Sequence, residues 1–257
     1  MPELPDIETF TRSLDGIFAG QKLTSVKVMN GRKLKDDQRT LSKELVGKKL
    51  INVYRSGKEM RFEFTGGKIL GLHLMLTGDI FLLEENKQRP FRIAELYFEN
   101  EGMVLTDRLG NAFVKLDPED KAGVDALSKE LNLDYLRRAL QRRAKIKTLL
   151  IDQNVVRGIG NGYSDEILWK ARISPYSIAN AIPDDKIKDL LKAIKSVLKE
   201  AIEQIDKKYR GKINVEVKEF LKIHTKAKDK SPTGKKIIID QKGMMKTYYT
   251  EEQILYK

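Results

Sequence analysis

The sequence predicts an α+β protein, in which a leading helix and a β-rich domain precede a helical domain and a basic hairpin. Apolar residues recur at helical spacing near the N-terminus, alternate with a period of two over residues 22–116, and return to helical spacing over residues 117–208. A chain of 257 residues exceeds the length of a typical single domain. We therefore expect two domains, or one domain with an appendage.

The composition favours a nucleic-acid partner and argues against several kinds of site. An excess of 49 basic over 37 acidic residues gives a formal charge of +12, which favours nucleic acid over an anionic membrane surface. The chain has no cysteine, so disulfides, thiolate metal sites and cysteine nucleophiles are excluded, and only His73 and His224 could supply imidazole. We expect no metal, no organic cofactor, no membrane-spanning segment and no targeting segment.

The first element is an amphipathic helix that follows Pro5 and ends at Gly20. The apolar face of this helix consists of Ile7, Phe10, Leu14, Ile17 and Phe18. The spacing of these side chains predicts that the helix packs on the domain that follows it.

The second part consists of short strands with glycine-containing turns. Met60, Phe62 and Phe64 alternate with charged residues and precede a turn at residues 66–67. Several such strands predict a sandwich or a barrel, and the order of the strands stays open.

The helical part begins near Asp117 and passes through a basic segment, residues 137–147, to a long helix over residues 184–208. The apolar stripe of that helix predicts core packing. After Gly211, β-like pieces at residues 237–239 and 247–249 lie among lysines and predict a basic hairpin.

The N-terminus, MPELPDIE, carries the first candidate chemistry. Inside a chain the nitrogen of Pro2 is an unreactive amide, but after removal of Met1 it becomes a secondary amine that can form an iminium. Glu3 lies beside it as a possible acid. Taken alone, a proline after methionine more often only begins a helix.

Two further segments carry polar residues on adjacent predicted strands, SGK at residues 56–58 and HLMLTG at residues 73–78. Without further context, Lys58 is a solvated charge and His73 is a hydrogen-bonded structural histidine.

The segment over residues 147–175 predicts a phosphate site. A helix ends near Val155, and the Gly158-Ile159-Gly160-Asn161 turn precedes the next helix. Glycines allow positive φ and let backbone N–H groups approach phosphate oxygens at the helix start, where Asn161 could donate its side-chain amide.

Taken together, these segments resemble the formamidopyrimidine-DNA glycosylase and endonuclease VIII family along essentially the whole chain. The resemblance implies an N-terminal β-sandwich (1–120), a helix-two-turn-helix domain (121–214) and a C-terminal finger (215–257). It also implies that Pro2 is the nucleophile, that Glu3 transfers protons, and that Lys58 is a third catalytic residue reaching the phosphate of the target nucleotide.

The same resemblance implies a set of residues that contact DNA. It assigns phosphate contacts to Lys58, Lys147, Asn161 and Lys242, and it makes His73 the start of the family's His-Leu motif. Most relatives carry a four-cysteine zinc finger, whose cysteine positions correspond here approximately to Ser231, Gly234, Thr250 and Gln253. We therefore expect a zincless β-hairpin, in which residues 244–246 leave the register open; the alternative is a generic lysine-rich tail.

A flipped nucleotide leaves a gap that relatives fill with three side chains. The best match places Leu76 and Leu109 at the two apolar wedge positions. It places Asp107 at the arginine that reads the opposite base, whereas a shift of one residue would place Arg108 there. The sequence leaves both registers open.

The function that the resemblance implies is a bifunctional DNA glycosylase and AP lyase that removes oxidised bases and cleaves the strand by β,δ-elimination. Its partner is damaged double-stranded DNA, and we expect a monomer, cytoplasmic and nucleoid-associated in a bacterium or nuclear in a eukaryote. The alternatives are a non-catalytic DNA-damage or DNA-structure binder and a general basic scaffold protein. The preferred lesion stays open.

Overall fold

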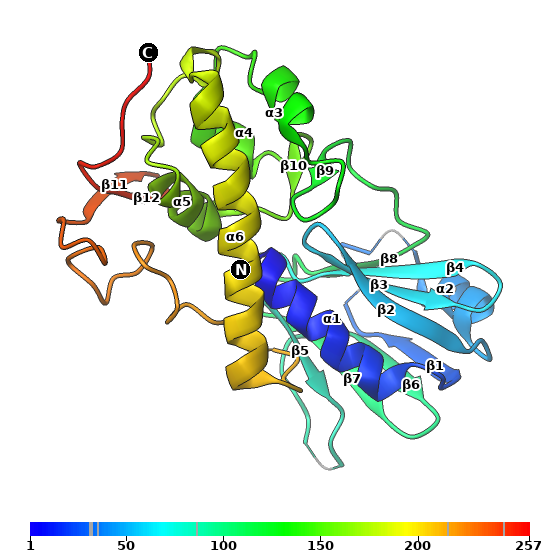
Figure 1. Cartoon of the computed structure of the whole chain (residues 1–257). Coiled ribbons are helices and arrows are strands. Elements are labelled where there is room, and N and C mark those ends of the chain that lie inside the picture. The colour runs from blue at the N-terminus through cyan, green and yellow to red at the C-terminus, as the bar shows by residue number, and fades with distance from the viewer. Residues whose placement is uncertain (31–32, 35, 86, 215, 244) are drawn as a thin grey trace. The chain divides into compact units, whose positions relative to one another are not determined.

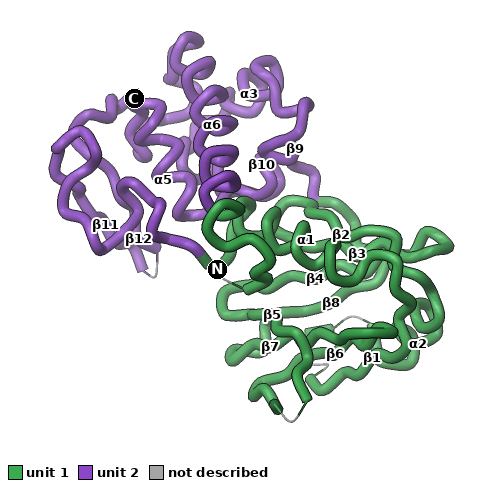
Figure 2. Tube along the Cα trace, turned by 60° about the horizontal axis from the view of Figure 1, so that its bottom comes forward, with its two compact units in different colours: residues 1–120, 205–216 green, residues 121–204, 217–257 purple. Residues whose placement is uncertain are grey.

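Figure 1 presents a computed structural model of the chain, which describes residues 1–30, 33–34, 36–85, 87–214, 216–243 and 245–257. The chain divides into two compact units, coloured green and purple in Figure 2. Unit 1 comprises residues 1–120 and 205–216, and unit 2 comprises residues 121–204 and 217–257. The three-domain division expected from the sequence stays a prediction.

Unit 1 begins with helix α1 (Leu4–Phe18), which carries a proline in its first turn and buries one apolar face. The buried positions follow the helical repeat and include Ile7, Phe10, Leu14 and Phe18. The backbone leaves the helix through Gly20, whose φ of +90° suits a residue without a Cβ atom. The predicted amphipathic helix is confirmed.

Two four-stranded antiparallel sheets follow in unit 1. The first has the order β1 (Leu23–Val28), β6 (Arg92–Phe98), β7 (Gly102–Asp107), β5 (Gly78–Leu82), and the second β2 (Leu50–Ser56), β3 (Glu59–Phe64), β4 (Lys68–His73), β8 (Phe113–Leu116). Apolar side chains of both sheets, of α1 and of helix α2 (Gln38–Leu45) belong to one buried cluster. Of the two alternatives left open above, the sandwich is therefore correct.

Unit 2 is mainly helical. Its elements are the paired strands β9 (Val124–Asp125) and β10 (Val156–Arg157), helices α3 (Leu133–Ala139), α4 (Ile146–Ile151), α5 (Asn161–Lys170), η1 (Ala179–Ala181) and α6 (Asp184–Tyr209), and the hairpin β11 (Ile238–Lys242) and β12 (Met245–Tyr249). The residues of α6 from Ile205 onward belong to unit 1. No helix in the described part of the chain is long and apolar enough to cross a membrane.

The connection between α4 and α5 is organised by one side chain, Gln153. Its amide nitrogen donates to the carbonyls of Ile151 and Ile159, both at 2.8 Å, and its carbonyl accepts the N–H of Gly158 at 2.9 Å. Gly158 has a φ of +101°, a conformation that a residue with a Cβ atom rarely adopts. The turn that presents the start of α5 is therefore held by side-chain hydrogen bonds.

Candidate functional site

The predicted nucleophile lies directly before α1. Pro2 and Glu3 are both buried, and the N–H of Glu3 donates to the carboxylate of Asp6 at 2.9 Å in the first turn of the helix. The Met1 ammonium forms an ion pair with Glu216 at 3.1 Å. While Met1 is attached, the nitrogen of Pro2 is an amide, so chemistry at this atom requires a chain that begins with Pro2.

Lys58 lies in the two-residue turn between β2 and β3, where Gly57 has a φ of +60°. The buried guanidinium of Arg55 donates to the Gly57 carbonyl at 3.0 Å and to Glu8 of α1 at 2.9 Å. The helix that follows Pro2 is therefore connected to the Lys58 turn through one ion pair. Because Glu8 and Arg55 are 47 positions apart, sequence patterns offered no signal for this pairing.

His73 organises the loop that follows β4. Its Nδ1 atom accepts the N–H of Met75 at 3.0 Å, and its ring lies nearly parallel to that of Phe113, with 5.6 Å between centroids. An accepting Nδ1 carries no proton, which is the pattern of a structural histidine. The structural interpretation of this residue therefore fits its contacts.

Asp107 corrects one expectation from the sequence. Its side chain is buried and accepts the backbone N–H groups of Leu109, Asn111 and Ala112, together with the hydroxyl of Thr77. Burial raises the pKa of Asp107, but these hydrogen bonds outweigh burial and bring the pKa below its ordinary value. A carboxylate with its acceptors occupied in this way is not available to a DNA base, which argues against a reading role for Asp107, and the register itself stays a prediction.

The exposed side chains near Asp107 come from two loops. Gly78 pairs with Asp107 at the ends of β5 and β7, so the loop before β5 and the loop after β7 leave the sheet together. Leu76, in the loop before β5, is 57% exposed. In the loop after β7, Leu109 is 51% exposed and its neighbour Arg108 is also exposed. Isolated apolar side chains of this size at loop tips are candidate wedges.

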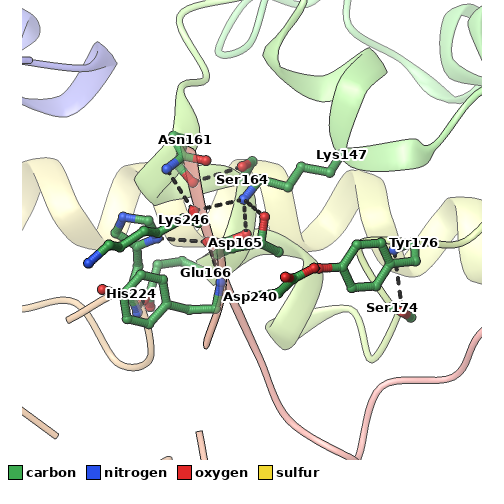
Figure 3. Close-up of polar contacts among 12 residues, drawn as sticks. Lys147, Asn161, Ser164, Asp165, Glu166, Ser174, Tyr176, His224, Asp240 and Lys246 are labelled. Atoms are coloured by element: carbon green, nitrogen blue, oxygen red, sulfur yellow. Dashed lines mark hydrogen bonds and ion pairs between the residues drawn. The ribbon is translucent and has the colours of Figure 1, made fainter. Parts of the chain in front are cut away.

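Lys147 is a second correction (Figure 3). It was expected to contact phosphate, but it is 6% exposed, and its ammonium contacts the Asp165 carboxylate at 2.6 Å and the Thr247 hydroxyl at 2.9 Å. A buried ammonium with these partners is not available to a phosphate. Lys147 instead connects α4 to α5 and to β12.

Two acidic residues of α5, Asp165 and Glu166, form the centre of this polar cluster (Figure 3). Asp165 is fully buried and also contacts His224 Nδ1 at 2.7 Å and the N–H of Tyr248 at 2.9 Å. Glu166 accepts three successive backbone N–H groups, residues 222–224, each at 2.8 Å. Burial raises the pKa of Glu166, although these amides act in the opposite direction. Sequence reasoning did not single out either residue. The pair of adjacent acidic residues within an otherwise mainly uncharged helix could have indicated them.

Asn161 begins α5 and donates its side-chain amide to the Lys246 carbonyl at 2.9 Å, while its Oδ1 atom is buried with no hydrogen-bond partner in the described part of the chain. Lys246 and Lys226 lie close enough that the charge of Lys226 lowers the pKa of Lys246. Like charges crowded in this way mark a candidate anion site, which sequence reasoning did not single out.

Lys242 is exposed at the end of β11 and pairs with Met245 across the hairpin. The connecting turn contains Gly243, with a φ of +59°, and residue 244, which lies outside the described residues. The tip of this basic hairpin therefore presents a lysine to solvent.

Two family models match the chain. The Formamidopyrimidine-DNA glycosylase N-terminal domain matches residues 1–110, and the Formamidopyrimidine-DNA glycosylase H2TH domain matches residues 122–211. The chain belongs to the formamidopyrimidine-DNA glycosylase family. The predicted α+β fold, with its β-sandwich and helix-two-turn-helix domain, is confirmed.

Named relatives agree with this membership. The formamidopyrimidine-DNA glycosylase of Pelotomaculum thermopropionicum is 31% identical over 269 residues, covering 97% of this chain and 97% of that protein. A Lactococcus lactis Fpg bound to DNA with an abasic site superposes with a TM-score of 0.86 at 25% identity, covering 97% and 98% of the two chains. The wild-type Lactococcus lactis Fpg bound to DNA with an oxidised pyrimidine gives a TM-score of 0.86 at 26% identity over the same shares.

The zinc finger that most family members carry does not fit this chain. The chain contains no cysteine, and the part that the structure describes holds no group of three His, Asp or Glu side chains that could bind a metal. Ser231, Thr250 and Gln253, at three of the positions expected for ligands, are buried hydrogen-bonding residues. Hydroxyl and amide groups are poor ligands for Zn²⁺, so no metal enters the chemistry derived below.

Proposed function

We propose that this chain is a DNA glycosylase of base excision repair, which removes oxidised bases through the amine of Pro2 and then cleaves the strand as an AP lyase. Family membership supports the glycosylase activity, since the relatives above carry that name. The single observation that carries the mechanism is the N-terminus, where Pro2 and an acidic neighbour, Glu3, lead directly into α1. The solved neighbours bound to damaged DNA support the substrate class.

In the proposed reaction, the lone pair of the Pro2 nitrogen attacks C1′ of an extruded nucleotide. The bond between C1′ and the base breaks, and the base leaves with the electron pair and takes up the proton that the Pro2 nitrogen loses. Opening of the sugar ring, with Glu3 transferring a proton to the ring oxygen, leaves an iminium between Pro2 and C1′. Loss of a proton from C2′ then expels the 3′ phosphate, and a second elimination expels the 5′ phosphate.

Phosphate positioning falls to cations and amides that are exposed or half-buried. We assign it to Lys58, Asn161 and Lys242, and we add Lys226 and Lys246 because of their crowded charges. Lys147 acts indirectly in this proposal, by holding α5 against β12.

The space that the flipped nucleotide leaves would be filled by Leu76 and Leu109, with Arg108 facing the opposite base. The burial of Asp107 supports this register over the alternative. His73 would hold the Leu76 loop through its contact with Met75.

Borohydride trapping tests the mechanism. Protein whose mass confirms Pro2 as the first residue is mixed with duplexes that each carry one oxidised base, and the iminium is reduced to a stable adduct. An adduct localised to Pro2 supports the proposal, and the reacting duplex identifies the lesion. Protein that retains Met1 is the matched control, because its Pro2 nitrogen is an amide and should give no adduct at Pro2.

Two outcomes contradict the proposal. An equally strong adduct with the Met1-retaining control, formed at an amine other than the Pro2 nitrogen, would show that the chemistry does not use the secondary amine. Tight, salt-sensitive binding of damaged duplexes with no adduct on any of them would instead indicate a non-catalytic damage binder on the same scaffold.

A further inference from the structure

The finger of this chain contains two turns that replace the expected zinc ligands. In the first turn, residues 231–234, the N–H of Gly234 donates to the Ser231 carbonyl at 2.9 Å. In the second turn, residues 250–253, the N–H of Gln253 donates to the Thr250 carbonyl at 3.3 Å. Strand β11 follows the first turn, and β12 ends immediately before the second. A side chain that contacts both turns therefore also holds together the two ends of the β11–β12 hairpin.

The carboxylate of Glu252 joins them. Its Oε2 atom accepts the hydroxyl of Thr233 in the first turn at 2.7 Å and the hydroxyl of Thr250 in the second turn at 3.2 Å. Oε2 also accepts the indole N–H of Trp169 at 3.4 Å, and Oε1 forms an ion pair with Arg172 at 2.8 Å. We call these five residues the Glu252 cluster; it connects both turns to the end of α5.

The residues at the former ligand positions extend this cluster. Ser231 Oγ lies 2.8 Å from Thr233 Oγ1, and since Thr233 gives its only hydroxyl proton to Glu252, Ser231 must donate to Thr233. Gln253 accepts the N–H of Thr250 at 2.8 Å and donates to the Ile173 carbonyl at 2.9 Å. Hydrogen bonds therefore connect the positions where a metal would have been bound.

Arg172, a member of the cluster, has an unusual backbone conformation. It has a φ of +59°, directly after the end of α5, where glycine is the usual residue. A residue with a Cβ atom persists in this conformation only when its surroundings hold it there. Its surroundings are main-chain hydrogen bonds, from the N–H of Arg172 to the Trp169 carbonyl at 3.1 Å and from the N–H of Ile254 to the Arg172 carbonyl at 2.9 Å, together with Glu252 and the ring of Trp169, 5.3 Å from the guanidinium.

The charge state of Glu252 agrees with this arrangement. Burial raises the pKa of Glu252, but the hydrogen bonds from Thr233 and Trp169 and the ion pair with Arg172 outweigh burial and bring the pKa below the ordinary value for glutamate. The carboxylate is therefore ionised at neutral pH, when hydrogen bonds to it are strongest.

We propose that Glu252 is a positioning residue that takes the place of the finger's structural metal, cross-linking both turns to α5 so that the β11–β12 hairpin presents Lys242 to DNA. The DNA-facing part of this inference rests on the proposed function, whereas the cross-link itself does not. Glu252 reaches its partners as a metal would, from one point between two turns that are distant in sequence.

The test uses the full-length protein and a duplex that carries a non-reactive abasic-site analogue, so that binding is measured without catalysis. The variant Glu252→Gln keeps the shape of the side chain and removes its charge. The matched control is Glu251→Gln, because Glu251 is adjacent but pairs at the surface with Lys235, their side chains being 68% and 51% exposed. Surface pairs of this kind contribute little to stability.

We expect Glu252→Gln to weaken duplex binding about 10-fold at moderate salt and to lower the slope of log affinity against log salt by about 1, as the loss of one phosphate contact does. Lys242→Ala should give the same change, and the double variant should be no weaker than either single variant. Glu251→Gln should stay within about twofold of the unmodified protein. A chelator should leave the unmodified protein unchanged.

Three results would overturn the inference: an unchanged affinity and salt slope in Glu252→Gln, effects of Glu252→Gln and Lys242→Ala that add, or loss of binding on chelation. Hydrogen exchange provides a second readout that needs no DNA. In Glu252→Gln, amides of residues 231–253 should exchange faster while those of α1 and β2–β4 are unchanged; unchanged exchange of the hairpin would contradict the cross-link.

These results are separable from the fate of the proposed function. If the trapping experiment fails but Glu252→Gln still loosens the hairpin and reduces the salt slope, the cross-link stands on a non-catalytic DNA binder. If trapping succeeds but Glu252→Gln changes neither the hydrogen exchange of the hairpin nor the salt slope, only the proposed cross-link is wrong.

Discussion

At the scale of single residues, the acidic side chains of this chain fall into distinct groups. Asp107 and Asp165 are buried and accept several hydrogen bonds each, so their roles are structural. Glu3 lies next to the proposed nucleophile and belongs to the proposed chemistry. Burial alone therefore does not identify a catalytic acid, and the partners of each carboxylate decide its role.

Replacing Glu3 by Gln, or retaining Met1 before Pro2, should reduce base excision by about 100-fold or more, because proton transfer or the secondary amine is lost. The affinity for a duplex with a non-reactive abasic analogue should stay within about threefold, since neither residue is assigned a phosphate contact. Single-turnover excision and equilibrium binding measure the two quantities. Full excision activity in either variant would refute the mechanism.

Asp79 on β5 should make stability depend on pH. Burial raises its pKa from 3.8 to about 6, and the nearby charge of Glu216 adds to this, although the N–H of Ile80 and the charge of Arg89 oppose it. As the pH rises, Asp79 loses its proton at a lower pH in the unfolded chain than in the folded chain. Its contribution therefore lowers the free energy of unfolding as the pH rises from about 4 to about 6.

Asp79→Asn should consequently stabilise the protein at pH 7.5 but have little effect at pH 4, with a difference of at most about 3 kcal/mol. Urea denaturation at both pH values measures the free energy of unfolding. An equal effect of the substitution at both pH values would contradict the assigned cause.

At the scale of elements, α1 and the β2–β3 hairpin are connected by the Glu8–Arg55 ion pair. Arg55 has a side chain only 7% exposed, and it holds the carbonyl of Gly57 next to Lys58. Removing Arg55 leaves Glu8 with the exposed Arg12 as its remaining ion-pair partner and removes the hydrogen bond to Gly57. The geometry of Lys58 therefore depends on a helix whose start carries Pro2.

Arg55→Met should lower the excision rate about 10-fold through displacement of Lys58 and should also destabilise unit 1. Adding Glu8→Gln should recover part of the lost stability but not the excision rate, because the Gly57 contact stays absent. The matched control is Arg12→Met, since Arg12 pairs with the same Glu8 but its side chain is 53% exposed. Comparable losses of excision in both arginine variants would argue against a positioning role for Arg55.

At the scale of the whole molecule, the net charge of +12 predicts that affinity for any duplex falls steeply as salt increases. Phosphate contacts carry no sequence information, so they fix register rather than specificity. Asn161 combines one such assigned contact with a hydrogen bond to the Lys246 carbonyl, and therefore affects both the turn before α5 and the hairpin.

Asn161→Ala should weaken binding to every duplex by a similar factor, about 10-fold, and should leave the salt slope nearly unchanged, because a neutral amide neutralises no phosphate. Titrations with several flanking sequences at two salt concentrations measure both effects. A loss confined to one flanking sequence would show that Asn161 reads bases instead.

The sequence by itself determined the fold class and led to the proposal of N-terminal chemistry. Helical spacing after Pro5, period-two alternation in residues 22–116 and the glycine turn before Asn161 are local patterns, and local patterns survive in a single sequence because backbone geometry imposes them. The absence of cysteine likewise excluded a zinc-thiolate finger without any structure.

Only the tertiary structure decided which charged residues face inward. Lys147 was expected to face DNA, and one of two registers gave Asp107 that role, yet both are buried. Lys147 contacts Asp165, and Asp107 contacts Thr77 and the loop that follows it. The Glu8–Arg55 pair and the Glu252 cluster join residues tens of positions apart. Such pairings depend on how the elements pack, and no periodicity in the sequence encodes the partner of a buried charge.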